Sequence, residues 1–564
     1  MVRPWAIAGP VLVLLLAAPL IRPLFSPTGT TDPESMTLEA VRSVLRHHSL
    51  VLDPTRVRNA EAVYHNGTAF FATDAPVFSI TLSGVGWVIE RAGVSVEKNP
   101  VLFEYLLILF AITLPTALAS GLIYRMARSF ELPRWWRMLI AMASVLATGW
   151  FSYCVILMPH ALAAALVTIA ATSVWYVASA KKPMLAVGWL AGGGFCAALA
   201  AAIEPNAAWM LVLLPMVVLV LKQPARVRLI GLLLVIAGAA APIVLHISVT
   251  TAITGDLLPP SLHASHLAPQ MPVVAPYIGD DIEPIDASLW VAIGRGLNRL
   301  IVFTVGTHGI FSHFPVLVIA MTGLLMVLHR HWTGVLKWIA GGVLVAIVLQ
   351  LIVRMTIRVD LTHLSFAAPS MVAMLPLLML FSGAWLRRPH GGLVWTIAGI
   401  GLGVSVLITL IGATGPAPQD GFTGYTAAEA VERLFTKTDP AVGLTDLSLR
   451  SSRSFSSESM GIMVQAKTQT QLPRFLLDNT AFLPSAGSMF HFKASIQAMV
   501  CQHNSPVYAP GTTFKRGSTP RSWSTTSNWH FPPTASSPPT SRPPPAAKAG
   551  SIFFISRGEV AGAR

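Results

Sequence analysis

Charged residues are scarce in this chain. Asp, Glu, Lys and Arg make up 11% of its 564 residues, whereas a soluble domain carries about 25%. Cysteine is scarcer still: Cys154, Cys196 and Cys501 have the spacing of neither a zinc site nor a disulfide framework. The sequence contains no Walker A motif, no dinucleotide-binding fingerprint and no internal repeat of fixed period. These absences exclude an ordinary soluble domain and leave no nucleotide-binding motif.

Long apolar blocks take the place of charge. Hydrophobic residues form 53% of the chain, and the mean hydropathy is +0.63. About twenty apolar residues cross the hydrocarbon core as a helix, the conformation that satisfies its own backbone hydrogen bonds in lipid. We therefore predict an all-α polytopic membrane protein with about eleven transmembrane helices. The predicted blocks are 5–25, 101–124, 138–158, 161–180, 184–203, 207–221, 229–253, 310–328, 335–353, 364–386 and 392–413.

The first block has an alternative interpretation as a signal peptide. It follows a single Arg3, continues through Arg22 and lacks a clear cleavage site of small residues. A retained first helix fits these features better, so the polytopic domain is predicted to cover 1–413.

Basic residues in the short loops predict the orientation. They follow the second, fourth, sixth, eighth and tenth blocks, and so fall on the side that the N-terminus shares. Cytoplasmic loops carry such an excess of Lys and Arg. The sequence therefore predicts a cytoplasmic N-terminus in an inner or plasma membrane. The net charge of +14 is thereby explained by topology and membrane lipids, and no nucleic-acid partner is expected.

Three segments lie outside the predicted helices on the other side of the membrane. Two are large outer loops, about 26–100 and 254–309, and the third is an extracytoplasmic segment over 414–502. Residues 503–564 form a Ser/Thr/Pro-rich tail that is predicted to be disordered. Its scattered Trp and Phe residues are also what a shifted reading frame would produce, so we assign it no function.

The first outer loop holds the residues best suited to chemistry. Asp32 and Glu34 follow the first helix directly, and a helix is predicted from Pro33 to His48, with Pro33 in its first turn. Asp32 could act in a reaction or simply cap that helix. Asp74 follows later in the same loop, before Ala75 and Pro76.

This arrangement resembles the GT-C superfamily of membrane glycosyltransferases. The nearest likeness is to the aminoarabinose-transferase and protein-mannosyltransferase group and the RgtA/B/C/D-like bacterial proteins. That group has an acidic residue after helix one, here Asp32 or Glu34, and then a Tyr-Tyr-Ser-Asp-Lys-Pro-Pro pattern that 70–79 (FFATDAPVFS) resembles. The lysine of the pattern is Ala75 here and the second proline is Val77, so one phosphate-pairing cation is missing.

The resemblance implies sugar transfer from a polyprenyl-phosphate donor to an acceptor hydroxyl at the outer face. Asp32 or Glu34 would take the acceptor proton, and Asp32 would hold a divalent cation if the reaction uses one. Arginine side chains at the outer side would contact phosphate, or would merely extend to the lipid head groups. The remaining substrate-binding candidates are Asp74, His160, Arg295, Arg299, His308, Arg354 and Arg358.

Two other classes stay open. A non-catalytic relative would keep the scaffold without the chemistry, which the loss of the lysine at Ala75 favours. A transporter would show broken helices at the midplane and two related halves, and neither is evident in the sequence.

Overall fold

The structure is a computed structural model. It describes residues 4–21, 33–53, 63–260, 296–297, 300–301, 303–305, 309–329, 332, 334–356 and 369–413. The predicted segments 414–502 and 503–564 lie outside the described residues.

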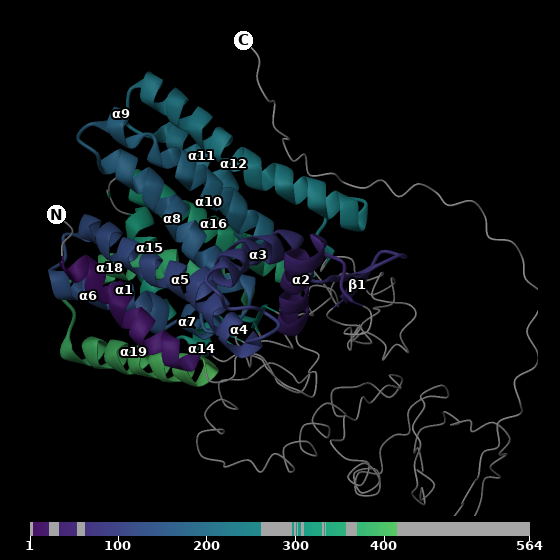
Figure 1. Cartoon of the computed structure of the whole chain (residues 1–564). Coiled ribbons are helices and arrows are strands. Elements are labelled where there is room, and N and C mark those ends of the chain that lie inside the picture. Colours follow the sequence, from purple (N-terminus) through teal and green to yellow (C-terminus); the bar gives the residue numbers. More distant parts are fainter. Residues whose placement is uncertain are drawn as a thin grey trace, which may run out of the picture.

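Helices dominate the described chain (Figure 1), and a single two-stranded sheet accompanies them there. The first part contains α1 (Pro4–Ala17), η1 (Ala18–Leu20), α2 (Pro33–His47), β1 (Val63–His65), β2 (Phe70–Ala72), α3 (Pro76–Arg91), α4 (Pro100–Ile108), η2 (Leu109–Thr113), α5 (Leu114–Met126), η3 (Ala127–Phe130), α6 (Arg134–Leu146), α7 (Gly149–Tyr153) and α8 (Pro159–Ser179). The second part contains α9 (Pro183–Ala186), α10 (Trp189–Ile203), η4 (Pro205–Ala207), α11 (Trp209–Val220), α12 (Ala225–Thr254), α14 (Ile310–His313), α15 (Val316–His329), α16 (Gly334–Thr356), η8 (Pro369–Met374), α17 (Leu375–Leu380), α18 (Ser382–Leu386) and α19 (Gly392–Ala413).

Seven helical stretches in the described part of the chain are long and apolar enough to cross a membrane. They are Pro100–Phe130, Pro159–Ser179, Pro183–Ile203, Ala225–Thr254, Gly334–Val353, Pro369–Leu386 and Gly392–Ala413. Shorter apolar helices cover Ala6–Leu20, Pro205–Val220 and Val316–His329. A multi-pass helical membrane protein is therefore supported, while the count of eleven crossings stays a prediction. The predicted block 138–158 is divided, because α6 ends at Leu146 and Thr148 caps the start of α7.

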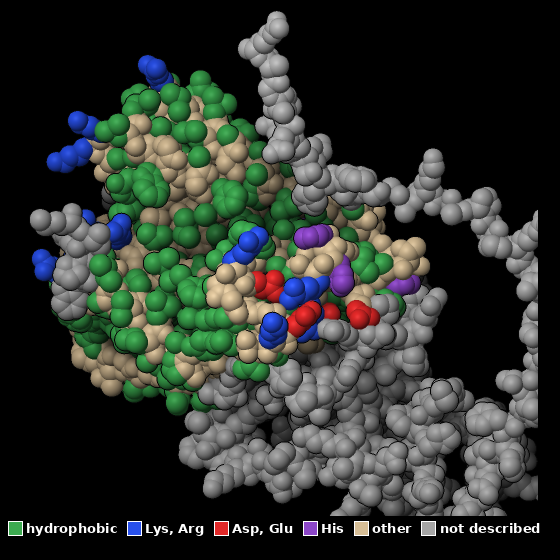
Figure 2. All heavy atoms as spheres, in the orientation of Figure 1, with side chains coloured by type: hydrophobic (Ala, Val, Ile, Leu, Met, Phe, Trp, Pro, Cys, Tyr) green, Lys and Arg blue, Asp and Glu red, His purple; other side chains and the backbone are tan. Residues whose placement is uncertain are grey.

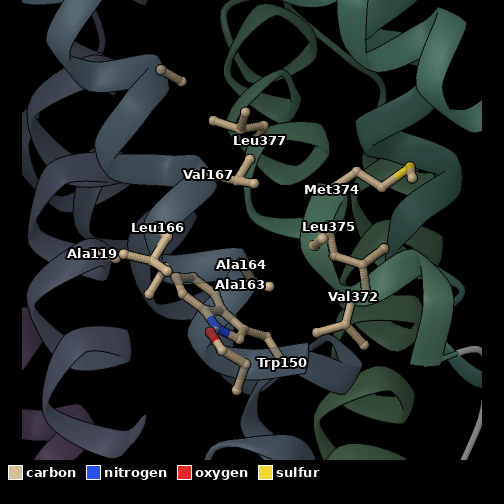
Figure 3. Packing of buried hydrophobic residues seen from close by; sticks show 14 of the residues in the cluster. Ala119, Trp150, Ala163, Ala164, Leu166, Val167, Val372, Met374, Leu375 and Leu377 are labelled. Atoms are coloured by element: carbon tan, nitrogen blue, oxygen red, sulfur yellow. Dashed lines mark hydrogen bonds between the residues drawn. The ribbon is translucent and has the colours of Figure 1, made fainter. Parts of the chain in front are cut away.

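The core lies where α7, α8 and α17 meet. Figure 3 shows Trp150 of α7 beneath Leu166 of α8, with Leu377 of α17 next to Val167 of α8 and Leu375 of α17 to the right. Trp150 is fully buried, and its indole Nε1–H donates to the carbonyl oxygen of Ala161 at 3.0 Å. This hydrogen bond removes the cost of burying a polar group in a membrane protein core. It also fixes the short helix α7 against the first turns of α8.

Glycines allow α10 and α12 to approach closely. A Cβ on Gly194 would collide with the carbonyl oxygen of Val235 in α12, and one on Gly238 would collide with that of Ala191 in α10. Small residues are the usual means of close helix approach in membranes. Gly192 is different, since a Cβ there would meet no atom within 4 Å.

The two ends of the bundle differ in charge. One end carries α2, α3 and the sheet, where acidic, basic and histidine side chains gather (Figures 1 and 2). The opposite end shows only Lys and Arg on the face seen in Figure 2. There, Arg387 Nη2 donates to Glu131 Oε2 at 2.6 Å, which joins the loop after α18 to the loop before α6. The loop charges predicted that these two loops share a side.

The small sheet and α2 pack together at the mixed-charge end. β1 and β2 are antiparallel, with Val63 opposite Ala72 and His65 opposite Phe70. Met36 and Ala40 of α2 form a buried apolar cluster with Leu52, Val63 and Ala72. This cluster fixes the face of α2 that turns toward the segment between β2 and α3.

Replacing Gly194 by Ala is expected to lower the thermal stability of the purified protein in detergent. The new Cβ forces α10 away from α12, and such overpacking typically costs about 1–3 kcal/mol. The matched control is Gly192→Ala in the same helix, which has open space around the new methyl group. Because Ala favours helix over Gly by roughly 0.5–1 kcal/mol, this control should keep or raise the melting temperature. Equal melting temperatures for both variants would contradict the close approach.

Candidate functional site

The candidate site begins at α2, the helix predicted after the first membrane block. Its observed range, Pro33–His47, confirms the predicted range of Pro33 to His48 within one residue. Glu34 in its first turn is only 1% exposed, and Thr37 follows one turn later on the same face. The Thr37 hydroxyl donates to Asp74 Oδ2 at 2.6 Å. This bond brings the two acidic parts of the first outer loop together.

Asp74 lies between β2 and α3, which positions it from both sides. α3 starts two residues later at Pro76, where the fixed φ of proline suits the first helical turn. Asp74 is partly exposed. Burial raises the pKa of Asp74, and Glu204 raises it further, while the Thr37 hydrogen bond and His160 oppose the rise. Such a carboxylate accepts protons at higher pH than an ordinary Asp.

His160 and Glu204 form a second pair within electrostatic reach of Asp74. His160 lies in the first turn of α8, after Pro159, and Glu204 follows the last residue of α10. Nδ1 of His160 is 2.6 Å from Oε2 of Glu204, although the contact is poorly aligned for a hydrogen bond. The ring also packs edge-on against Tyr153 of α7, with centroids 5.0 Å apart.

Glu204 is held on its other oxygen by Asn206. Both the side-chain amide and the backbone N–H of Asn206 donate to Oε1 of Glu204. Gln350 of α16 donates in turn to Oδ1 of Asn206 at 2.9 Å. Burial alone would raise the pKa of Glu204, but His160 and the bonds from Asn206 outweigh it and hold that pKa below its usual range. Glu204 and Asp74 are therefore shifted in opposite directions.

The residues described so far are named the acidic cluster: Glu34, Thr37, Asp74, Tyr153, His160, Glu204, Asn206 and Gln350. Three residues predicted from the sequence, Glu34, Asp74 and His160, belong to it. Five others lie outside the described residues, namely Asp32, Arg295, Arg299, His308 and Arg358. Arg354 is in α16, but its side chain is also outside the description.

Five members of the acidic cluster were not among the predicted site residues: Thr37, Tyr153, Glu204, Asn206 and Gln350. Glu204 and Asn206 interrupt a long apolar run between α10 and α11, and Gln350 interrupts the apolar α16. Ionisable and amide groups at such positions are functional candidates by default, so a signal was present for three of the five. Thr37 gave none, because a threonine on a mixed helix is common.

The described residues contain no group of three His, Cys, Asp or Glu side chains that could hold a metal ion. Asp32, the predicted metal ligand, lies outside them, so a divalent cation stays a prediction that depends on that residue.

An apolar groove of about 570 Å³ runs along the part of α3 that follows its first turn. It is lined by Thr81, Gly84, Val85, Val88, Ile89 and Ala92 of α3 and by Leu106, Phe110 and Leu114 from α4, η2 and α5. At about 1.5 Å of rise per residue, Thr81 lies roughly 8 Å along α3 from Pro76. Asp74 and the groove are thus positioned by one helix.

The chain matches no protein-family model and no curated protein sequence. Among solved structures it is similar to the archaeal oligosaccharyltransferase AglB from Archaeoglobus fulgidus in complex with an inhibitory peptide and a dolichol-phosphate. That match has a TM-score of 0.42 at 10% identity and covers 82% of this chain and 60% of AglB. It is also similar to apo ArnT from Cupriavidus metallidurans, with a TM-score of 0.42, 14% identity, and coverage of 79% of this chain and 70% of ArnT.

A second structure of the Archaeoglobus fulgidus oligosaccharyltransferase, in the apo form, gives a TM-score of 0.39 at 11% identity and covers 82% of this chain and 61% of that one. At these values the similarity carries no argument about activity or about individual residues, which rest on the acidic cluster alone.

The raised pKa of Asp74 predicts a pH-dependent effect of Asp74→Asn on stability. The folded protein binds the Asp74 proton more tightly than the unfolded chain, so the wild type loses stability as pH rises above about 3.9, the ordinary value for Asp, through the folded pKa. Asn cannot ionise and still accepts the Thr37 hydrogen bond. The melting temperature of the variant relative to wild type should therefore increase from pH 4 to pH 7. A difference that stays constant over this range would contradict the assigned environment.

Proposed function

We propose that this protein is a membrane glycosyltransferase that moves a sugar from a polyprenyl-phosphate donor to an acceptor hydroxyl at the outer membrane face. The observation that carries the proposal is Asp74, a partly exposed carboxylate with a raised pKa, held by Thr37 beside the His160–Glu204 pair. Helix α2, which carries Glu34 and Thr37 of the acidic cluster, lies at the end of the bundle that the loop charges predict to be outside the cytoplasm (Figure 1). A donor that is anchored in the membrane would bring its phosphate to this level.

The reaction needs a base and a stabilised leaving group. The acceptor oxygen loses its proton to a carboxylate as it forms the new bond to the anomeric carbon of the sugar. The bond from that carbon to the phosphate oxygen breaks, and the polyprenyl phosphate leaves with the electron pair. General bases work best when their pKa lies near the working pH, which favours a carboxylate raised by its surroundings.

Among the described carboxylates, Asp74 suits the role of base better than Glu34. Glu34 is 1% exposed, so an acceptor would reach it only after α2 moved. Asp74 keeps part of its surface accessible. We therefore assign proton acceptance to Asp74, a supporting role to Glu34, and the role of base or metal ligand to Asp32 if it reaches the same cluster.

The groove along α3 supports a lipid-linked donor. Its lining is almost wholly apolar, and Phe110 on it is 48% exposed. Phe110 lies in the stretch Pro100–Phe130, which is long and apolar enough to cross a membrane, so we assign this side of the groove to the bilayer. We assign the groove to the first isoprene units of the donor, with its phosphate directed toward the acidic cluster.

Asp74→Asn is expected to lower the turnover number for sugar transfer at least about 100-fold, because it removes the base and keeps the hydrogen bond to Thr37. The assay uses the full-length protein in liposomes with radiolabelled polyprenyl-phosphate sugars and acceptor membranes from cells that lack the protein. Glu39→Gln is the matched control, since Glu39 lies on α2 but pairs with Arg42 away from the acidic cluster. Unchanged transfer by Asp74→Asn would remove Asp74 from the mechanism.

Gly84→Phe is expected to raise the KM for the donor several-fold and to leave kcat close to the wild-type value. The new ring would occupy the groove, while the fold tolerates it because a Cβ at Gly84 meets no atom within 4 Å. Gly192→Phe, in equally open space on α10, is the control. A KM equal to that of the control would exclude the groove as the donor site.

The same liposomes separate the enzyme from a transporter. A lipid-linked sugar that crosses the bilayer without any covalent product would overturn the transferase proposal.

A further inference from the structure

Aromatic rings join two turns at the end of the bundle that is predicted to face the cytoplasm. Trp135 and Trp136 at the start of α6 stack with centroids 3.7 Å apart, and Trp136 stacks on Trp395 of α19 at 5.2 Å. Trp385 of α18 contacts Trp395 edge-on at 5.3 Å and stacks on His390 at 3.9 Å. We name these residues the ring array. It holds the turn before α6 against the turn between α18 and α19, at the end of the bundle away from α2 (Figure 1).

The ring array reaches the surface beside the apolar helix α19. Trp135 is 56% exposed. Tryptophan favours the level of the lipid head groups, because its ring meets hydrocarbon while its N–H meets polar surroundings. α19 carries Trp395 in its first turn and is long and apolar enough to cross a membrane. Leu393 and Ile397, which flank Trp395, are 75% and 61% exposed. The array therefore indicates the head-group level, and the exposed apolar side chains of α19 continue from it toward the bilayer.

Cations without an acidic partner surround the ring array. Arg134 directly precedes the two rings of α6, Arg128 lies in η3 and Arg388 follows α18. Arg128 and Arg134 are exposed, Arg388 is half-buried, and none of them forms an ion pair in the described part of the chain. Glu131 is the one acidic residue in the described residues of these two turns, and it is already paired with Arg387. The surface beside the array therefore keeps a positive charge.

An anionic phospholipid fits both the cations and the apolar helix. Its phosphodiester suits the fork of a guanidinium group, and its acyl chains suit the exposed side chains of α19. A soluble anion would use only the cations, and a zwitterionic lipid would gain little from them because its own ammonium group would be repelled. Basic clusters at the membrane edge attract anionic lipids in this way.

We propose that an anionic phospholipid of the adjoining leaflet binds at the ring array, with its phosphate paired with Arg128, Arg134 and Arg388 and an acyl chain along α19. The bound lipid would connect α6, α18 and α19 at this end of the bundle. A ligand that binds only the folded state also raises its stability. The proposal does not depend on sugar transfer, and no bond is made or broken.

The test measures lipid binding to the full-length protein in a non-ionic detergent by native mass spectrometry. The probes are phosphatidylglycerol, phosphatidylcholine with the same acyl chains, and glycerophosphoglycerol, which carries the anionic head group without the chains. Wild-type protein should bind phosphatidylglycerol about tenfold more tightly than phosphatidylcholine. Glycerophosphoglycerol should not compete at the same concentration, and phosphatidylglycerol should raise the melting temperature more than phosphatidylcholine does.

The decisive variant is Arg128→Gln combined with Arg134→Gln. One basic residue beside an anionic lipid contributes roughly fivefold to affinity, so the double variant should bind phosphatidylglycerol on the order of tenfold more weakly and phosphatidylcholine as the wild type does. Retained phosphatidylcholine binding shows that the variant is folded. The matched control is Lys222→Gln combined with Arg226→Gln, which removes the same charge from exposed residues between α11 and the start of α12. It should stay within about twofold of the wild type, since a lipid at the ring array would not touch it.

Three results would overturn the proposal. Equal losses in the double variant and in its matched control would mean that the basic end attracts lipid only diffusely. Equal affinity of the wild type for phosphatidylglycerol and phosphatidylcholine would leave the cations without a lipid partner, as a surface for an acidic protein would be. Competition by glycerophosphoglycerol at the concentration of the lipid would assign the cations to a soluble phosphate.

Discussion

The low dielectric of a membrane-embedded helix bundle decides where this protein can keep charge. A carboxylate inside such a bundle must find a cation or several hydrogen-bond donors, or else take up a proton. Glu204 follows the first course, with His160 on one oxygen and Asn206 on the other. Asp74 follows the second in part, with one hydroxyl donor and a raised pKa. The positions of α2, α8, η4 and α16 are tied together through these contacts.

Local features of the fold could be predicted from the sequence. The thickness of the bilayer sets the length and composition of the apolar blocks, so most helices could be predicted from these blocks. Pro33 correctly predicted the first residue of α2. The division of 138–158 at Thr148 could not be predicted from hydropathy, because Thr148 caps α7 with a side-chain oxygen in an otherwise apolar stretch.

The acidic cluster was only half predictable. Glu34, Asp74 and His160 stood out as ionisable residues next to apolar blocks. The contacts that give them chemical character join residues far apart in the chain, such as Thr37 with Asp74 and Asn206 with Gln350. Such pairings depend on the tertiary arrangement of helices, and no local pattern encodes them. The missing lysine at Ala75 indicated a degenerate site, whereas the structure places His160, from a different helix, within electrostatic reach of Asp74.

The pKa of Asp74 is raised and the pKa of Glu204 is lowered, and this difference separates the chemical roles of the two carboxylates. Environments that push two carboxyl groups apart in pKa commonly separate their roles in acid–base chemistry. Glu204 stays ionised and is occupied on both oxygens, so it is poorly suited to accept a further proton. Asp74 has the higher proton affinity, an accessible surface and a single donor on one oxygen, so its other oxygen is open to an acceptor hydroxyl.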